Sequence, residues 1–224
     1  MRYITTQLLT EDEVSQIRSW VGASKNWVSG TKSQRIANVE RKNNIELHQG
    51  AESYKKASAL IANALSKNKE FGDFVIPIKT SGITISRTRT GGFYKPHFDT
   101  HTLGDFSNTL FLSDPSEYDG GELCLWSDGK VEKIKLTPGM MITYECGIAH
   151  QVNEVTRGMR DVAVFWAKSE FKNEKLRDAM TDLFKCKEIL GETPVLDTIE
   201  ESQTNPSFLI SQIIHTIRRY NHRQ

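Results

Sequence analysis

The chain lacks an excess of charge of either sign. Its 29 basic and 28 acidic residues leave a formal net charge of +1 over 224 residues. Proteins that are drawn to nucleic acids or membrane surfaces by long-range electrostatics carry a large field of one sign. We therefore expect neither a nucleic acid nor a membrane as a partner.

Long apolar runs are also missing. No stretch approaches the roughly 20 consecutive apolar residues that a membrane-spanning helix needs. The opening segment, residues 1–13, turns acidic where a signal peptide would have an apolar region. With 38% hydrophobic and 25% charged residues, the composition is that of an ordinary globular protein. We expect a cytoplasmic protein.

Cysteine is scarce, and no two cysteines lie close together in the sequence. Cys124, Cys146 and Cys186 are odd in number and far apart in the chain. Disulfide frameworks and cysteine-based zinc sites need paired, closely spaced cysteines, so the pattern argues against both. Histidine and carboxylate side chains become the most plausible metal ligands, and the chain has six histidines.

Strand and turn signals dominate the middle of the chain. From about residue 73, short runs of β-branched and aromatic residues alternate with turn signals roughly every 8 to 12 residues, which indicates an antiparallel sandwich or barrel. Asp119-Gly120-Gly121, Asp128-Gly129 and Pro138-Gly139 supply turn residues that favour positive φ. The predicted strands cover residues 83–89, 94–99, 108–113, 121–126, 131–136, 140–144, 150–155 and 160–167.

Helices are predicted on both sides of this core. Thr10 and Glu13 form a capping box before a helix over residues 11–22. Apolar residues at helical spacing then indicate a second helix around residues 54–65, a third around 176–184 and a last one from about 206. The apolar stripe of the last helix could pack on the domain itself or on a second subunit, so a homodimer through this helix stays open.

The expected fold class is α+β with a mainly β core. We divide the chain into an N-terminal helical segment that packs on the core (1–72), the β core (73–168) and a C-terminal helical extension (169–224). The chemistry-bearing residues fall in the middle segment.

His97 and Asp99 lie in the run GGFYKPHFDTH, residues 91–101. Pro96 biases the residue before it towards an extended conformation. If the strand continues, His97 and Asp99 project from the same face of the sheet. His101 could add a further ligand, although it would take a position that a co-substrate needs.

A second histidine, His150, follows several predicted strands later. Two histidines and one carboxylate form the facial triad that holds non-haem Fe(II) and leaves open positions for a co-substrate and O₂. Zinc would accept the same three ligands.

Arg160 favours iron chemistry over zinc. It stands at the head of an apolar strand, where an uncompensated guanidinium is costly to bury. A dicarboxylate that chelates the metal through a 2-oxo acid end could present its other carboxylate to this guanidinium. Arg157 competes for the same role, but the position of Arg160 within the strand favours Arg160.

Five ordered elements carry a family pattern: Tyr94-x-x-His97-x-Asp99, FLSDPSEYDGGEL (111–123), LTPGMMITY (136–144), His150-Gln-Val, and TRGMR (156–160) followed by VAVFW. Together they resemble the PKHD-type hydroxylases, in the prolyl 4-hydroxylase-like branch of the Fe(II)- and 2-oxoglutarate-dependent dioxygenases. The resemblance implies a double-stranded β-helix, or jelly roll. It also implies that His97, Asp99 and His150 hold Fe(II), that Arg160 binds the distal carboxylate of 2-oxoglutarate, and that ascorbate keeps the iron reduced.

One feature departs from the family. Many relatives place a tyrosine about nine positions before the first histidine, where this chain reads Ser-Arg-Thr-Arg over residues 86–89. Tyr94 could supply a phenol to the co-substrate instead. Trp27, Arg35, Lys42 and Asn44 lie where relatives place a segment near the active-site mouth, or else in a solvated loop. We expect Trp126 and Trp166 in the core.

The resemblance implies hydroxylation of an unactivated C–H bond, with release of succinate and CO₂ and with a prolyl residue of a peptide or protein as the expected substrate. A nucleic-acid demethylase of the same fold, a non-catalytic cupin-like metal-binding module and a zinc hydrolase are the alternatives. The small net charge disfavours the demethylase, and Arg160 disfavours a simple metal holder.

Overall fold

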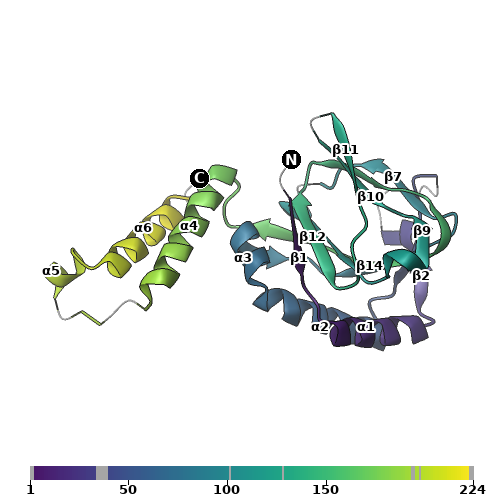
Figure 1. Cartoon of the computed structure of the whole chain (residues 1–224), viewed down its shortest axis with the longest axis horizontal. Coiled ribbons are helices and arrows are strands. Elements are labelled where there is room, and N and C mark those ends of the chain that lie inside the picture. The colour runs from purple at the N-terminus through teal and green to yellow at the C-terminus, as the bar shows by residue number, and fades with distance from the viewer. Residues whose placement is uncertain are drawn as a thin grey trace. The chain divides into compact units, whose positions relative to one another are not determined.

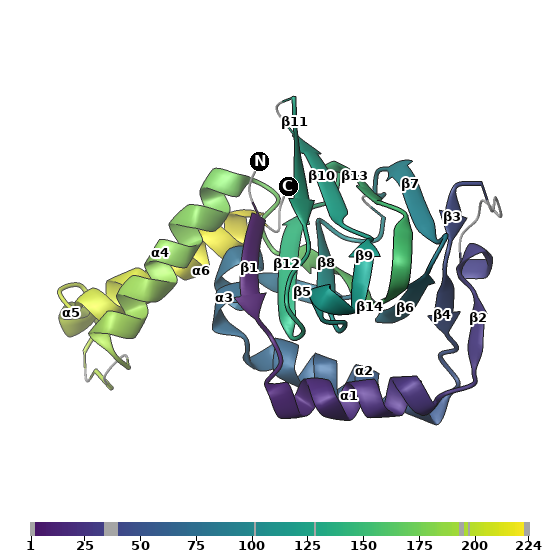
Figure 2. The same cartoon turned by 45° about the vertical axis from the view of Figure 1, so that its right-hand side comes forward.

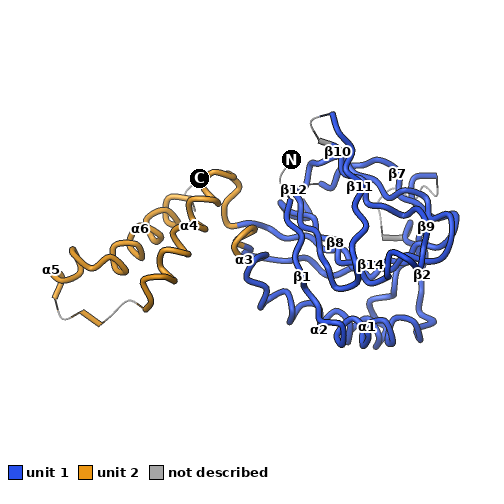
Figure 3. Tube along the Cα trace, viewed as in Figure 1, with its two compact units in different colours: residues 1–72, 77–169 blue, residues 73–76, 170–224 orange. Residues whose placement is uncertain are grey.

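The computed structural model describes residues 3–33, 40–100, 102–127, 129–192, 195–196 and 198–221. Arg35, His101 and Asp128 lie outside these ranges. The chain forms two compact units, shown in Figure 3. One unit comprises Met1–Gly72 and Pro77–Ser169, and the other comprises Asp73–Ile76 and Glu170–Gln224. Each unit is described by itself below.

The first unit is built on two antiparallel sheets (Figures 1 and 2). The larger sheet runs in the order β1 (Tyr3–Gln7), β12 (Met140–Glu145), β8 (Phe106–Phe111), β14 (Val155–Ser169), β6 (Thr84–Arg89), β4 (Ile45–Leu47) and β2 (Trp27–Ser29), and β5 (Pro77–Thr80) and β9 (Tyr118–Gly120) also pair with β14. The smaller sheet runs in the order β11 (Lys130–Ile134), β10 (Leu123–Ser127), β13 (Ala149–Val152), β7 (Phe93–His97) and β3 (Lys42–Asn43). The predicted mainly β core is therefore present.

An apolar cluster draws on strands of both sheets. Its buried members are Phe111, Leu123, Leu125, Ile134, Ile142, Tyr144 and Val162. Alternate residues of a strand point to opposite faces, so each of these strands can give one face to the shared core. Burial of these large side chains is the main stabilising contribution that joins the two sheets.

Two helices pack against each other beside the sheets: α1 (Glu11–Ala23) and α2 (Glu52–Lys67). The predicted capping box is confirmed, because the Thr10 hydroxyl accepts from the Glu13 amide and the Glu13 carboxylate accepts from the Thr10 amide at 2.9 Å. A 3₁₀ turn, Gly30–Ser33, follows β2, and α3 (Lys69–Val75), which was not predicted, follows α2.

The turns follow the predicted glycine chemistry. Gly139 has a φ of 87°, which the third position of a type II turn after Pro138 requires. Gly120 and Gly121 have φ values of 70° and 65°. A Cβ on Gly120 would collide with the carbonyl oxygen of Glu154, so this position needs glycine for space as well as for conformation.

Two predicted strands are interrupted or end early, and several short strands were missed. The predicted strand 150–155 breaks into β13 and β14, because residues 153 and 154 turn back to bond Glu122 and Gly121. The predicted strand 94–99 ends at His97. The missed strands include β1, β4, β5 and β9. Of these, β1 is a short edge strand that depends on pairing with β12, a contact that the local sequence does not reveal.

The second unit is helical, with α4 (Glu174–Leu190), α5 (Ile199–Ser202) and α6 (Pro206–Asn221). Its core gathers Ile76, Phe171, Met180 and Ile214, with partly buried neighbours on α4 and α6. Ile210, Ile214 and Ile217 of the predicted apolar stripe of the last helix thus pack within this unit. No helix among the described residues is both long enough and apolar enough to cross a membrane.

Arg87 on β6 and Asp161 on β14 form a nearly buried ion pair. The guanidinium donates from Nε at 2.8 Å and from Nη2 at 2.7 Å to the two carboxylate oxygens. The two side chains are 7% and 12% exposed. The same guanidinium lies 4.1 Å from the Trp27 ring centroid, so the pair links three strands of the larger sheet.

We expect Arg87→Met to lower the free energy of unfolding by about 3–5 kcal/mol, because it leaves Asp161 as an uncompensated charge with little access to water. Chemical denaturation of the purified chain measures this. The matched control is Arg157→Met, which removes a pair with Asp119 whose side chains are both 59% exposed, and which should change stability little. Equal effects of the two substitutions would contradict a structural role for the Arg87 pair.

Candidate metal and co-substrate site

Strand pairing brings the two predicted histidines together. β13 pairs antiparallel with β7, and His150 lies directly opposite His97. Their ring centroids are 4.1 Å apart. The register shifts between His150 and Val152, which places Tyr94 opposite Val152. The smaller sheet therefore fixes two imidazoles on one face of neighbouring strands.

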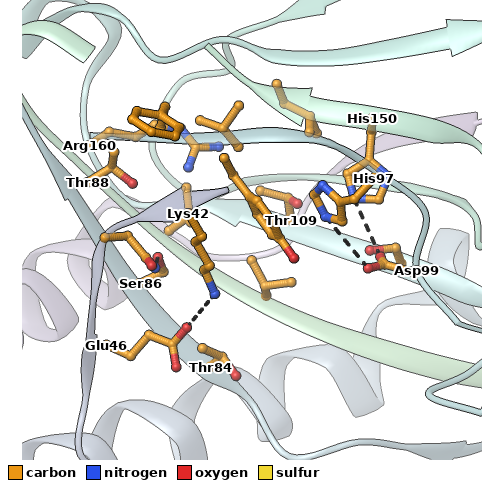
Figure 4. Close-up of a pocket in the computed structure, with 18 of the residues that line it drawn as sticks. Lys42, Glu46, Thr84, Ser86, Thr88, His97, Asp99, Thr109, His150 and Arg160 are labelled. Carbon is orange, nitrogen blue, oxygen red and sulfur yellow. Dashed lines mark hydrogen bonds and ion pairs between the residues drawn. The ribbon is translucent and has the colours of Figure 1, made fainter. Parts of the chain in front are cut away.

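Asp99 completes the group from a connection rather than from a strand. β7 ends at His97, so the expectation that strand alternation alone would align Asp99 with His97 was wrong. The carboxylate nevertheless points at both rings (Figure 4), with Oδ2 3.6 Å from His150 Nε2 and Oδ1 4.0 Å from His97 Nε2. The Trp166 indole Nε1 donates to Asp99 Oδ2 at 2.9 Å. A contact from β14, rather than the alternation of β7, therefore orients the Asp99 carboxylate.

The donor atoms of this group suit a divalent metal ion. Nδ1 of His97 lies 2.8 Å from the Lys95 carbonyl oxygen, and Nδ1 of His150 lies 2.9 Å from the Ile148 carbonyl oxygen. A carbonyl oxygen can only accept, so each Nδ1 carries a proton and each Nε2 keeps its lone pair. One ligand atom from each of the three residues lies within 4.8 Å of the others.

Burial keeps His97 in the form that a metal needs. Loss of solvent, followed by the neighbouring His150, lowers the pKa of His97 to about 4. The imidazole is therefore neutral near pH 7, and only a neutral imidazole can donate its lone pair to a metal.

Arg160 lies on β14 opposite Thr88 of β6 and is only 3% exposed. Its Nε has no hydrogen-bond partner, and no carboxylate of the described residues lies within ion-pair distance of its guanidinium. Burial lowers its pKa more than the nearby Tyr118 raises it. The neighbouring Asp161 is paired with Arg87, since adjacent residues of a strand point to opposite faces. Arg160 is a buried cation that lacks an anion.

Arg157, the competing candidate, is already satisfied. Its guanidinium donates to both carboxylate oxygens of Asp119, at 2.6 and 3.1 Å, on an exposed surface. Between the two arginines, only Arg160 faces the cavity described next.

A cavity of about 260 Å³ contains both the metal-ligand group and Arg160, on opposite sides of the view in Figure 4. Hydroxyl-bearing residues of β6, namely Thr84, Ser86 and Thr88, line one wall. The apolar side chains of the lining are Phe93, Leu103, Leu123, Val152, Val162 and Val164. The remaining lining residues are Lys42, Asn44, Glu46, Tyr94, Ser107, Thr109, Tyr144 and Trp166.

A second charged pair lies in the cavity wall. Lys42 Nζ is 2.7 Å from Glu46 Oε1, and the two side chains are 12% and 8% exposed. Lys42 Nζ also lies 5.1 Å from the Tyr94 ring centroid, and that ring stacks on His97 at 3.5 Å. Of the two alternatives for Lys42 and Asn44, a cavity wall rather than a solvated loop is therefore the one observed.

Sequence reasoning missed several residues of this site. Glu46 had one usable signal, a carboxylate in the middle of a short apolar strand four residues after Lys42. The expected core position of Trp126 was wrong, because it is 57% exposed. Trp166 is partly buried, but it lines the cavity and bonds Asp99 instead of only filling the core.

Comparison with known proteins agrees with this geometry. Residues 83–168 match the family model of the 2OG-Fe(II) oxygenase superfamily. A PKHD-type hydroxylase of Prochlorococcus marinus (strain NATL2A) is 33% identical over 214 residues, which cover 92% of this chain and 97% of the relative. A PKHD-type hydroxylase of Maricaulis maris (strain MCS10) is 34% identical over 203 residues, which cover 87% and 91% of the two chains.

Two solved structures share the fold. A prolyl-4-hydroxylase of Pseudomonas putida superposes with a TM-score of 0.55 at 17% identity, over 75% of this chain and 92% of that one. A prolyl hydroxylase of Trichoplax adhaerens was solved in complex with a peptide fragment of the hypoxia inducible factor oxygen degradation domain. It superposes with a TM-score of 0.59 at 15% identity, over 80% of this chain and 86% of that one. The predicted jelly-roll core is confirmed. The chain belongs to the PKHD-type hydroxylases of the 2OG-Fe(II) oxygenase superfamily.

Proposed function

We propose that the chain hydroxylates a prolyl residue of a peptide or protein, with Fe(II) as cofactor and with 2-oxoglutarate and O₂ as co-substrates, and releases succinate and CO₂. One observation carries the proposal: a buried arginine without a carboxylate partner shares a cavity with His97, Asp99 and His150. A metal holder without turnover has no use for such a cation.

In this proposal His97, Asp99 and His150 hold Fe(II) through two Nε2 atoms and a carboxylate oxygen. This set leaves the remaining coordination positions to small molecules. When bound, the metal and co-substrate supply the oxidising chemistry. The residues of the chain fix the ligand geometry, aim one C–H bond and, once substrate is bound, exclude water from the cavity.

Charge balance supports a dianion as the second ligand. The charged residues of the described lining, apart from the histidines, are Lys42, Glu46, Asp99 and Arg160, and their formal charges cancel. A divalent metal ion would therefore leave its own charge unbalanced, which a dicarboxylate offsets. In this proposal Arg160 takes the far carboxylate through its planar fork. Tyr94, held against His97, offers its hydroxyl to the same co-substrate.

A prolyl substrate is supported by the character of the cavity and its surroundings. Its apolar wall suits an aliphatic ring, and Leu103 in that wall is 45% exposed. Phe98, between two proposed ligands, is 63% exposed, which offers a peptide an apolar contact. The two solved structures that share the fold are named as prolyl hydroxylases. Ascorbate is the proposed reductant, and no nucleic acid is proposed as a partner because the net charge is small.

We expect His150→Ala to weaken binding of Mn(II), used as a redox-stable probe, by more than roughly 100-fold. Loss of a group that only supports a metal ligand costs roughly 10- to 100-fold in affinity, and His150 is proposed as a ligand itself. Isothermal titration of the apo protein measures it, and thermal unfolding without metal shows whether the fold persists. His48→Ala, which removes an exposed histidine, is the control and should bind as the parent does. Unchanged affinity in a folded His150→Ala protein would refute the ligand assignment.

We expect Arg160→Met to raise the dissociation constant for 2-oxoglutarate by roughly 30-fold or more, since loss of a buried charged partner costs about 2 kcal/mol or more. Titration of the Mn(II)-loaded protein gives the constant. Arg157→Met should leave it unchanged. Because Arg160 has no anion in the ligand-free protein, its loss should not lower stability without co-substrate. Equal affinities in the two variants would remove Arg160 from the co-substrate site.

A mass-spectrometric screen tests the substrate class. Proline-containing peptides incubated with the enzyme, Fe(II), 2-oxoglutarate, ascorbate and air should gain one oxygen atom at proline, and no gain should occur without 2-oxoglutarate. Succinate release coupled to oxidation of another residue type, and none at proline, would contradict the prolyl assignment and leave the oxygenase assignment intact.

A further inference from the structure

The side chain of Asp99 is not fixed by the strand that carries His97. Asp99 follows the end of β7, in residues 98–100 that have no regular structure. Among the described residues, the only hydrogen bond that its carboxylate accepts comes from the Trp166 indole, at 2.9 Å. The orientation of this carboxylate therefore depends on a residue of the other sheet.

Trp166 is itself held firmly. Its amide donates to the Ser81 hydroxyl at 2.9 Å, and its carbonyl accepts from the Ser81 amide at 2.8 Å. On the other side it pairs with Ser107 of β8. Trp166 thus stands on a strand with neighbours on both sides, which restricts where its indole can point.

The connection that carries Asp99 is docked on the same part of β14. The Asp105 amide donates to the Ala167 carbonyl at 2.8 Å, and the Asp105 carboxylate accepts from the Ser169 amide at 2.8 Å. Gly104 allows this approach, because a Cβ there would lie 2.8 Å from the Ala167 carbonyl oxygen and 3.0 Å from Trp166 Cβ. The backbone contacts bring the connection to β14, and the indole bond then selects the direction of the carboxylate.

The chemistry of the donor matters as well as its position. An indole N–H is a neutral donor without acceptor capacity, so it orients the carboxylate without neutralising it. A lysine or arginine in its place would offset the negative charge that a metal needs from this ligand. By engaging Oδ2, the indole also favours ligation through a single oxygen, which keeps other coordination positions open.

We infer that Trp166 is a positioning residue for the metal ligand Asp99, and that its indole N–H presets the carboxylate before a divalent ion binds. This inference rests on the metal site proposed above. A tryptophan that only fills space or contacts substrate would leave metal affinity unchanged when its N–H alone is removed.

The first test removes the N–H and keeps an aromatic ring. Trp166→Phe should weaken Mn(II) binding by roughly 10- to 100-fold, as loss of a group that orients a metal ligand does. The control is Trp126→Phe, on an exposed tryptophan outside the cavity lining, which should bind Mn(II) as the parent does. Parental affinity in Trp166→Phe would overturn the inference and leave the proposed metal site standing. Failure of the parent protein to bind Mn(II) would instead overturn the proposed site.

A second test needs no metal, and it uses Trp166→Phe only to assign a signal. The chain has four tryptophans, so a ¹⁵N-labelled sample gives four indole signals, and the one missing from Trp166→Phe identifies Trp166. In metal-free Asp99→Ala this signal should move upfield in the proton dimension, because its acceptor is gone, while the signal of Trp126 stays in place. An unmoved Trp166 signal would show that the indole does not hold Asp99, whatever Trp166→Phe does to stability.

Discussion

The antiparallel pairing of β7 with β13 is the constraint on which the proposed site depends. It sets His150 opposite His97, although the two residues are far apart in the sequence. A register slip of one residue would turn one ring to the other face of the sheet. The carbonyl oxygens of Lys95 and Ile148, each two residues before its histidine, fix the ring tautomers. The strand pairing therefore sets the positions of the two imidazoles, and the local backbone sets which nitrogen carries the proton.

The larger sheet supplies the rest of the site. β14 runs through its middle and carries Arg160, Val162, Val164 and Trp166 along one wall of the cavity. Its Trp166 reaches Asp99, whereas its Arg160 keeps an uncompensated charge where solvent is excluded. Burying a cation without an anion opposes folding, and a bound dicarboxylate would remove that cost. The unpaired guanidinium thus favours binding of a complementary ligand.

Much of the site could be predicted from residue types and order. Two histidines, a carboxylate and an arginine at the head of an apolar strand pointed to one cavity, and the structure brings those side chains to it. The reason offered for Asp99 was wrong, because β7 ends two residues earlier and a tertiary contact does the positioning. Such contacts have no local signature: Trp166 reads as a core residue, and β1 exists only because β12 lies beside it. Tyr144 was missed for the same reason, whereas Glu46 had a local signal, a carboxylate within a short apolar strand.

The most direct test of the account is visible absorption of the purified chain with Fe(II) and 2-oxoglutarate under anaerobic conditions. A weak charge-transfer band should appear only when both are present, because the band reports a 2-oxo acid chelated to iron held by His97, Asp99 and His150. It should decay when air is admitted, with succinate formed. Absence of the band at saturating Fe(II) and 2-oxoglutarate, in a folded protein, would contradict the account.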